Sequence, residues 1–257
     1  MFERVAHRGA SSEAPENTLP AFELAFKKYR CDRVELDLHL TRDGVPVVFH
    51  DETLERTTDG VGWLRQFSLR EIKALDAGFR FDPGGKGEFP YRGKGVKVPT
   101  LEEVLTIFSD RGFFLEIKDR GPEIGQKVFE TLLRAGKNSK WVVGSFHGPT
   151  VRTFRRLAAG RVETFLAEDE TVLAHVAFRL GFPKMKLAGQ HASLPRTQFG
   201  FSLEGPQWIE FLHRSGAHVY YWTVNEISEM KELLRRGADG ILTDYPNRLA
   251  SLRGLPP

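Results

Sequence analysis

Residues 33–51 read RVELDLHLTRDGVPVVFHD, and this stretch decides the fold class of the chain. Side chains alternate across a strand, so Glu35 and Asp37 point to one face while the leucines beside them point to the other. Two carboxylates on an inward face are costly to bury, so we expect a cationic partner there. The turn sequence Arg-Asp-Gly within residues 39–50 predicts a hairpin that brings His50 back beside the carboxylates.

Short apolar runs typical of strands alternate with longer segments of helical periodicity along all 257 residues. This alternation predicts repeated βα units around a parallel sheet. The runs that we expect to form strands are 4–7, 33–38, 113–118, 141–145, 163–167, 185–188, 218–223 and 240–243. Eight strands close a barrel, and such barrels reach about 250 residues as one domain. The sequence therefore predicts a TIM (β/α)8 barrel that forms a single domain over residues 1–257.

Segments of helical periodicity separate the expected strands. They are 18–29, 101–110, 123–135, 149–158, 170–180, 205–214, 228–236 and 247–252. Residues 51–99 contain no further βα unit, only a short helical segment at 68–75 followed by two glycine-rich pieces. We expect this stretch to be a small insertion after the second strand, ending in a mobile loop near the mouth of the barrel.

Composition excludes several classes of protein. The 37 basic and 34 acidic residues are interspersed and leave a formal charge of +3. This pattern favours binding of anionic small molecules and argues against a nucleic-acid partner. Cys31 is the only cysteine, so neither an intrachain disulfide nor a thiolate metal site can form. No apolar run approaches the roughly 18 residues of a membrane span, and the first residues lack a signal-peptide pattern. We expect a cytoplasmic protein, and the oligomeric state stays open.

Acidic residues on two neighbouring strands form a candidate metal site. Functional groups of βα barrels come from the C-terminal ends of strands, where Glu35, Asp37 and Glu116 can converge. An all-oxygen set suits one divalent cation, Mg²⁺ or Ca²⁺, with Mn²⁺ as a further option. The alternative is that each carboxylate pairs with an arginine or lysine, but for all three together we favour the metal. Lys118 shares the face of Glu116 and can balance the carboxylates or hold a phosphate.

Two histidines reach the same rim from different segments. Cleavage of a phosphodiester needs one group to activate the attacking oxygen and another to protonate the leaving alkoxide. His7 and His50 can share these two tasks. Arg8 offers a guanidinium to phosphate oxygens, and Gly9 behind it lets the backbone come close. Trp222 ends a strand and is either core filler or an apolar wall for a glycerol-like group, and its position favours the wall.

Other polar residues receive a structural interpretation. A lone histidine is more often packed or on the surface than catalytic, and this applies to His39, His147, His175, His191, His213 and His218. His39 lies one residue past Leu38, close enough to the carboxylates that it can also approach the site. Asn17 and Thr18 are expected to cap a helix, and Asp244 to have a structural role.

Taken in order, these elements resemble the glycerophosphodiester phosphodiesterase family of metal-dependent TIM-barrel enzymes. The motifs that carry the resemblance are Ala6-His7-Arg8-Gly9, Pro15-Glu16-Asn17-Thr18, Glu35-Leu36-Asp37, Thr41-Arg42-Asp43-Gly44, His50-Asp51, Glu116-Ile117-Lys118, Trp222-Thr223-Val224-Asn225 and the segment from Asp239 to Pro246. No single motif is specific, but the ordered set is. It implies metal ligands at Glu35, Asp37 and Glu116, catalytic histidines at His7 and His50, and phosphate contacts at Arg8 and Lys118.

The resemblance implies hydrolysis of glycerophosphodiesters, which are deacylated phospholipids, to an alcohol and sn-glycerol 3-phosphate in lipid and glycerol metabolism. The attacking oxygen is either water or the glycerol 2-hydroxyl, and either histidine can be the acid. An enolase-like proton abstraction is a second hypothesis, but the Lys-x-Lys base and the further acidic strand that it needs are absent. A non-catalytic phosphodiester-binding barrel is the third, and the intact set of histidines and carboxylates argues against it.

Overall fold

The computed structural model describes residues 2–136, 140–198 and 200–252. Within them, eight parallel strands form the wall of a barrel in the order β6, β5, β4, β2, β1, β11, β10, β7. These strands are β1 (Glu3–His7), β2 (Arg33–Leu40), β4 (Gly112–Ile117), β5 (Trp141–Gly144), β6 (Glu163–Thr164), β7 (His191–Leu194), β10 (His218–Tyr221) and β11 (Gly240–Thr243). A parallel bridge between Phe165 and His191 joins the two ends of this order, so the TIM barrel predicted from the sequence is confirmed.

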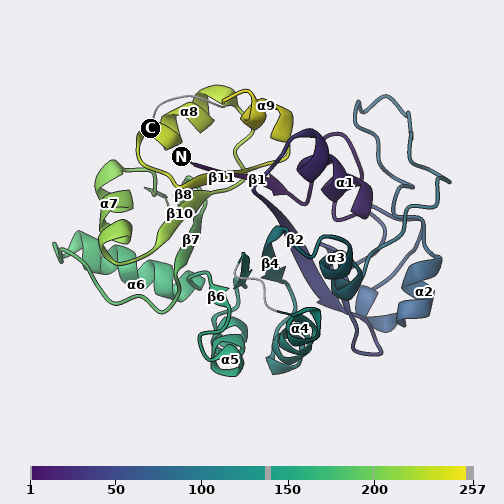
Figure 1. The fold of residues 1–257 in the computed structure, drawn as a ribbon, viewed down its shortest axis with the longest axis horizontal. Coiled ribbons are helices and arrows are strands. Elements are labelled where there is room, and N and C mark those ends of the chain that lie inside the picture. The colour runs from purple at the N-terminus through teal and green to yellow at the C-terminus, as the bar shows by residue number, and fades with distance from the viewer. Residues whose placement is uncertain (1, 137–139, 199, 253–257) are drawn as a thin grey trace.

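Helices surround the strands, as Figure 1 shows. They are α1 (Leu19–Glu23) with its π-helical continuation η1 (Leu24–Lys28), α3 (Leu101–Ile107), α4 (Pro122–Ala135), α5 (Gly148–Ala158), α6 (Glu168–Arg179), α7 (Pro206–Arg214), α8 (Ile227–Arg235) and α9 (Pro246–Ala250). Within the described ranges, no helix combines the length and the apolar character that a membrane crossing requires.

The alternation expected for the 33–38 run appears in β2. Leu36 and Leu38 are fully buried in the apolar layer between the sheet and the helices. The opposite face of the strand looks into the barrel, where a separate cluster of large side chains fills the interior. In that cluster the rings of Phe114 and Phe165 meet edge to face, with centroids 4.8 Å apart. The interior of the barrel is therefore a packed core and not a pore.

The insertion follows the short strand β3 (Pro46–Val48), which pairs antiparallel with β2. It contains η2 (Leu64–Gln66) and α2 (Leu69–Ala74) and packs around apolar residues of its own, among them Leu54 and Ile72. Figure 1 shows it on the side of the barrel that carries α1 and α3. A second antiparallel pair, β8 (Thr197–Gln198) and β9 (Phe201–Ser202), follows β7.

The prediction of one strand from the sequence is wrong. Residues 185–188 are not a strand, and the wall position is taken by β7, six residues further along the chain. Its residues pair with β10 from His191 opposite His218 to Leu194 opposite Tyr221. The apolar side chains of Met185 and Leu187 instead pack against the core outside the wall. Strand β6 is also shorter than expected, because regular pairing stops after Thr164.

Candidate active site

A cavity of about 290 Å³ opens where the barrel strands end. It is lined by all eight residues predicted as site residues from the sequence, which are His7, Arg8, Glu35, Asp37, His50, Glu116, Lys118 and Trp222. They come from β1, β2, β4, the hairpin after β2 and the end of β10. None of the six other histidines lines this cavity.

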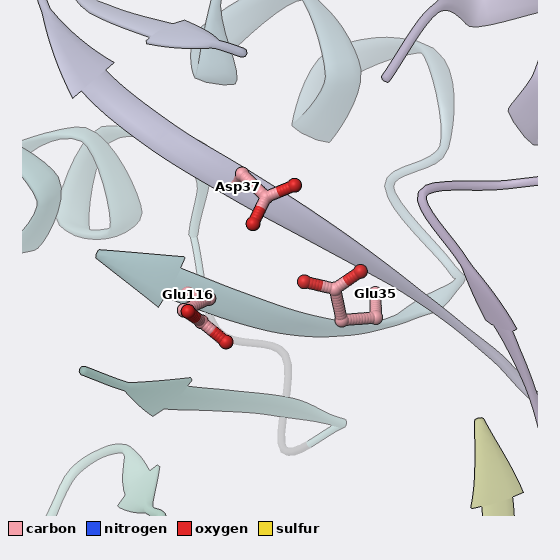
Figure 2. A group of neighbouring side chains, drawn as sticks. All are labelled: Glu35, Asp37 and Glu116. Atoms are coloured by element: carbon pink, nitrogen blue, oxygen red, sulfur yellow. The ribbon is translucent and has the colours of Figure 1, made fainter. Parts of the chain in front are cut away.

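Three carboxylates form the floor of the site. In the register of the sheet, Asp37 on β2 lies opposite Glu116 on β4. Figure 2 shows Glu35 and Asp37 following one another along one strand, with Glu116 on its neighbour. One oxygen from each of the three lies within 4.8 Å of the others. The spacing read from the sequence therefore does bring these side chains together.

The pKa values of the three carboxyl groups do not shift in the same direction. Burial and the neighbouring charge of Asp37 raise the pKa of Glu35 to about 8. Burial also raises the pKa of Glu116, although Lys118 opposes it. For Asp37, burial acts to raise the pKa, but the positive charges of Lys118 and Arg8 outweigh it and lower the pKa. The protein's own cations thus stabilise one carboxylate charge and leave the other two undercompensated.

Arg8 and Lys118 lie on either side of Asp37. Lys118 Nζ is 2.7 Å from Glu116 and 3.2 Å from Asp37. Arg8 Nε is 3.2 Å from Asp37, while its backbone N–H donates to Glu35 at 3.0 Å. Among the described residues, buried Arg8 Nε has no acceptor in hydrogen-bond geometry. Arg8 also lines the cavity, where its guanidinium can meet a bound anion.

His7 is held by groups of the barrel itself. Its Nδ1 lies 2.7 Å from Asp244 Oδ1, and Asp244 also accepts hydrogen bonds from Ser11 and Asn225. Its Nε2 lies 3.9 Å from Glu35. Burial acts to lower the pKa of His7, but the hydrogen bond with Asp244 and the charge of Glu35 outweigh it and raise the pKa. The structural role expected for Asp244 thus includes a direct contact with His7, which sequence reasoning missed.

His50 is held by groups of the insertion and the first βα loop. Its Nδ1 lies 2.5 Å from Asp51 Oδ1, and Arg56 pairs with the same carboxylate. Arg56 also reaches Glu16 at 2.7 Å, and Glu16 in turn accepts from Arg8 at 2.9 Å. Burial lowers the pKa of His50, with Arg8 acting in the same direction, although Asp37 and Asp51 oppose them. The pKa of His7 is therefore raised and the pKa of His50 lowered from the ordinary value of a histidine.

Two aromatic side chains also line the cavity, and one of them lies beside Lys118. The Trp222 and Phe146 rings meet edge to face with centroids 5.5 Å apart, and both line the cavity. Lys118 Nζ lies 5.7 Å from the centroid of the Phe146 ring. Phe146 was missed because a phenylalanine in the short loop after β5, between Ser145 and His147, carries no signal that separates a cavity wall from core packing.

Asn17 does not cap a helix as expected. Its side-chain amide donates to Asp37 Oδ2 at 2.8 Å, and it is almost fully buried. Thr18 precedes α1 at the N-cap position, but its hydroxyl donates to the Pro15 carbonyl and accepts no helical N–H. Asn17 thus supports a site carboxylate, while Thr18 takes the N-cap position without a capping hydrogen bond. The motif that contains it is part of the family resemblance, and that was the available signal.

Comparisons with known proteins agree with this geometry. The sequence profile of the glycerophosphoryl diester phosphodiesterase family matches residues 7–248. The chain is 33% identical over 254 residues to a glycerophosphodiester phosphodiesterase of Caldanaerobacter subterraneus, with 96% of each chain covered.

Solved structures agree in fold. A glycerophosphoryl diester phosphodiesterase domain from Mycobacterium tuberculosis matches with a TM-score of 0.86 and 22% identity, covering 98% of this chain and 99% of that one. An Oleispira antarctica phosphodiesterase, solved in complex with the product sn-glycerol-3-phosphate, matches with a TM-score of 0.76 and 28% identity over 97% and 95% of the two chains. The chain therefore belongs to the glycerophosphoryl diester phosphodiesterase family and is an enzyme of that family.

Proposed function

We propose that this enzyme hydrolyses small glycerophosphodiesters to an alcohol and sn-glycerol 3-phosphate, using one divalent cation and the imidazoles of His7 and His50. The observation that carries the proposal is the convergence of three carboxylates beside both histidines in one cavity. The family membership favours this reaction over the enolase-like and binding-only alternatives.

The donor set fits a hard divalent cation. Glu35, Asp37 and Glu116 offer only oxygen atoms, and the raised pKa values of Glu35 and Glu116 mark negative charge that the protein does not balance. These three residues would hold the ion, for which Mg²⁺, Ca²⁺ and Mn²⁺ are the candidates. When bound, the cation would neutralise charge that develops on the phosphoryl oxygens.

Arg8 and Lys118 supply the remaining positive charge. Arg8 and Lys118 both line the cavity, and Lys118 Nζ lies 2.7 Å from Glu116 and 3.2 Å from Asp37. Both can therefore donate to non-bridging phosphate oxygens. Fixed donors aimed at developing charge are the largest contribution to catalysis in many enzymes of this kind.

His7 and His50 move the protons. Each has its Nδ1 fixed by a carboxylate, from Asp244 or from Asp51, so each can present its Nε2 to the substrate. One takes the proton from the attacking oxygen, which is water or the glycerol 2-hydroxyl, and the other gives a proton to the leaving alkoxide. Trapping a cyclic phosphate by phosphorus NMR separates the two choices of attacking oxygen.

The aromatic wall suits the carbon skeleton of the substrate. Trp222 and Phe146 line the same cavity as the charged residues, so the phosphate can lie against the charges while the glycerol or the alcohol carbons contact the rings. The product complex of the Oleispira antarctica relative supports a small glycerol phosphate as the product here. The cytoplasmic location stays a prediction from the sequence.

The test is release of sn-glycerol 3-phosphate from a panel of deacylated phospholipids. EDTA should abolish turnover, and Mg²⁺, Ca²⁺ or Mn²⁺ should restore it. His7→Ala and His50→Ala should each lower kcat by about 10²-fold to 10⁴-fold while substrate binding is kept. His213→Ala, at a histidine outside the cavity, is the matched control and should keep full activity. Turnover that survives EDTA, or that survives loss of both histidines, would rule the proposal out.

A further inference from the structure

One buried histidine outside the cavity contacts the segment that carries His50. His39 lies on β2, two residues beyond Asp37 and on the same strand face, and its side chain is 5% exposed. Its Nδ1 lies 2.6 Å from Asp119 Oδ1 and its Nε2 lies 3.0 Å from the backbone carbonyl oxygen of His50. The ring therefore bridges two segments on either side of the strand.

Both partners of the His39 ring can only accept. A carboxylate oxygen and a peptide carbonyl oxygen have no proton to give, so each ring nitrogen must donate. The second oxygen of Asp119 accepts the backbone N–H of Leu40 at 2.7 Å, which fixes the carboxylate against β2. The donor to the His50 carbonyl is thus anchored in the barrel wall from two directions.

The backbone around His50 has few other ties to the wall. Phe49 N–H donates to the Asp37 carbonyl at 3.0 Å, and the next contact along the chain is the one between His50 and His39. Among the described residues, the hydrogen-bond partner of the His50 side chain is Asp51, which belongs to the same segment. Without His39, the His50 peptide would lose its hydrogen bond to the barrel wall.

We propose that His39 is a positioning residue, whose Nε2–H fixes the His50 peptide so that the His50 imidazole meets the substrate in the reactive orientation. The proposal rests on the catalytic role proposed above for His50. A small displacement of a reacting group is enough to lower turnover, since errors of about 1 Å can cost roughly 10²-fold. His39 itself does not line the cavity, so its effect reaches the substrate through the segments it contacts, and of its two hydrogen-bond partners His50 is the one that lines the cavity.

Substitutions that keep one donor at a time separate the two bonds of His39. A glutamine amide nitrogen takes the place of Nε2 and keeps the donor to His50, whereas an asparagine amide nitrogen takes the place of Nδ1 and keeps only the donor to Asp119. We expect His39→Gln to stay within about threefold of wild-type kcat and His39→Asn to lose about tenfold or more, with KM nearly unchanged in both. His39→Met removes both donors and should behave like His39→Asn.

His213→Asn is the matched control, because His213 bonds to Asp239 at 2.8 Å outside the cavity, and it should leave kcat unchanged. In a His50→Ala background, His39→Asn should cause no further loss of kcat. Equal losses in the glutamine and asparagine variants, or a further loss in the His50→Ala background, would overturn the positioning role. If His39→Asn does not fold, the comparison of His39→Gln with His39→Met decides in the same way. Full activity of His50→Ala would instead reject the proposed function.

Discussion

The two histidines of the site differ in what holds them. His7 ends a wall strand, and its partner Asp244 follows β11 and is fixed by neutral hydrogen-bond donors from Ser11 and Asn225. His50 lies on the hairpin after β2, and its partner Asp51 shares its charge with Arg56. His7 thus pairs with a carboxylate that is held by neutral donors, whereas His50 pairs with a carboxylate that also binds an arginine.

The pKa values of the two imidazoles also shift in opposite directions, and the causes of the shifts differ. For both rings burial lowers the pKa, but for His7 the bond with Asp244 and the charge of Glu35 outweigh burial. For His50, burial together with Arg8 and Lys118 outweighs Asp37 and the hydrogen bond with Asp51, whereas Arg8 lowers the pKa of His7 as well. Two imidazoles of different basicity at one phosphodiester suit a reaction that needs both an acid and a base. The comparison also shows that the insertion, and not only the barrel, takes part in the site.

The largest expected effect is a difference between variants of Asp244 and Asp51, the carboxylate partners of His7 and His50. Asp244→Asn removes the charge that orients His7 and should lower kcat by about 10²-fold or more, since an amide can hold the wrong tautomer. Asp51→Asn should lower kcat by less than about tenfold, because Arg56 already neutralises this carboxylate and His39 still holds the His50 backbone. Steady-state release of sn-glycerol 3-phosphate measures both. Equal losses in the two variants would contradict the comparison.

A smaller effect concerns the tie between the insertion and the first βα loop. Arg56→Gln removes the ion pairs to Glu16 and Asp51 and should lower kcat by a few-fold, with a shift in KM because Arg8 loses the support of a fixed Glu16. Arg42→Gln is the matched control, since Arg42 pairs with Glu71 on the exposed side of the insertion. Both variants need the same kinetic assay. A larger loss in the control than in Arg56→Gln would argue that the insertion acts through its general stability.

Much of the barrel and of the site can be read from the sequence because both follow local periodicity. The period of two placed Glu35 and Asp37 on one face, and the next wall strand supplied Glu116. Periodicity fails where a contact joins distant segments. His7 and Asp244 are 237 residues apart, so their hydrogen bond depends on β1 lying beside β11 in the closed barrel.

The misplaced strand has a physical cause as well. Residues 185–188 carry more apolar side chains than β7, whose first residue is a histidine, so an apolar count selects the wrong run. The histidine is accommodated because its ring packs against Tyr220 inside the barrel while its Nε2 bonds to Glu163. Such a pairing becomes visible only when the neighbouring strands are in place.

The smallest expected effect is on the pH dependence of stability in EDTA. The folded pKa of His7 is raised, so its stabilising contribution is present below the unfolded value of about 6.5 and is lost as pH rises through the folded value. The folded pKa of His50 is lowered, so its contribution is present above about 6.5 and is lost as pH falls. Urea unfolding at pH 5 and pH 9 should show His7→Gln more destabilised at pH 5 and His50→Gln more destabilised at pH 9. The same sign in both variants would refute the contrast.

The proposed function depends on Glu35, Asp37 and Glu116 holding one divalent cation beside both histidines. Calorimetric titration of the EDTA-treated protein with Mn²⁺ at pH 7, repeated in buffers of different ionisation enthalpy, tests it directly. Because the pKa of Glu35 is raised to about 8 without the ion, binding should occur at one site and release close to one proton, and Glu35→Gln should abolish that release. No saturable binding, or binding and proton release unchanged in Glu35→Gln and Glu116→Gln, would contradict the account.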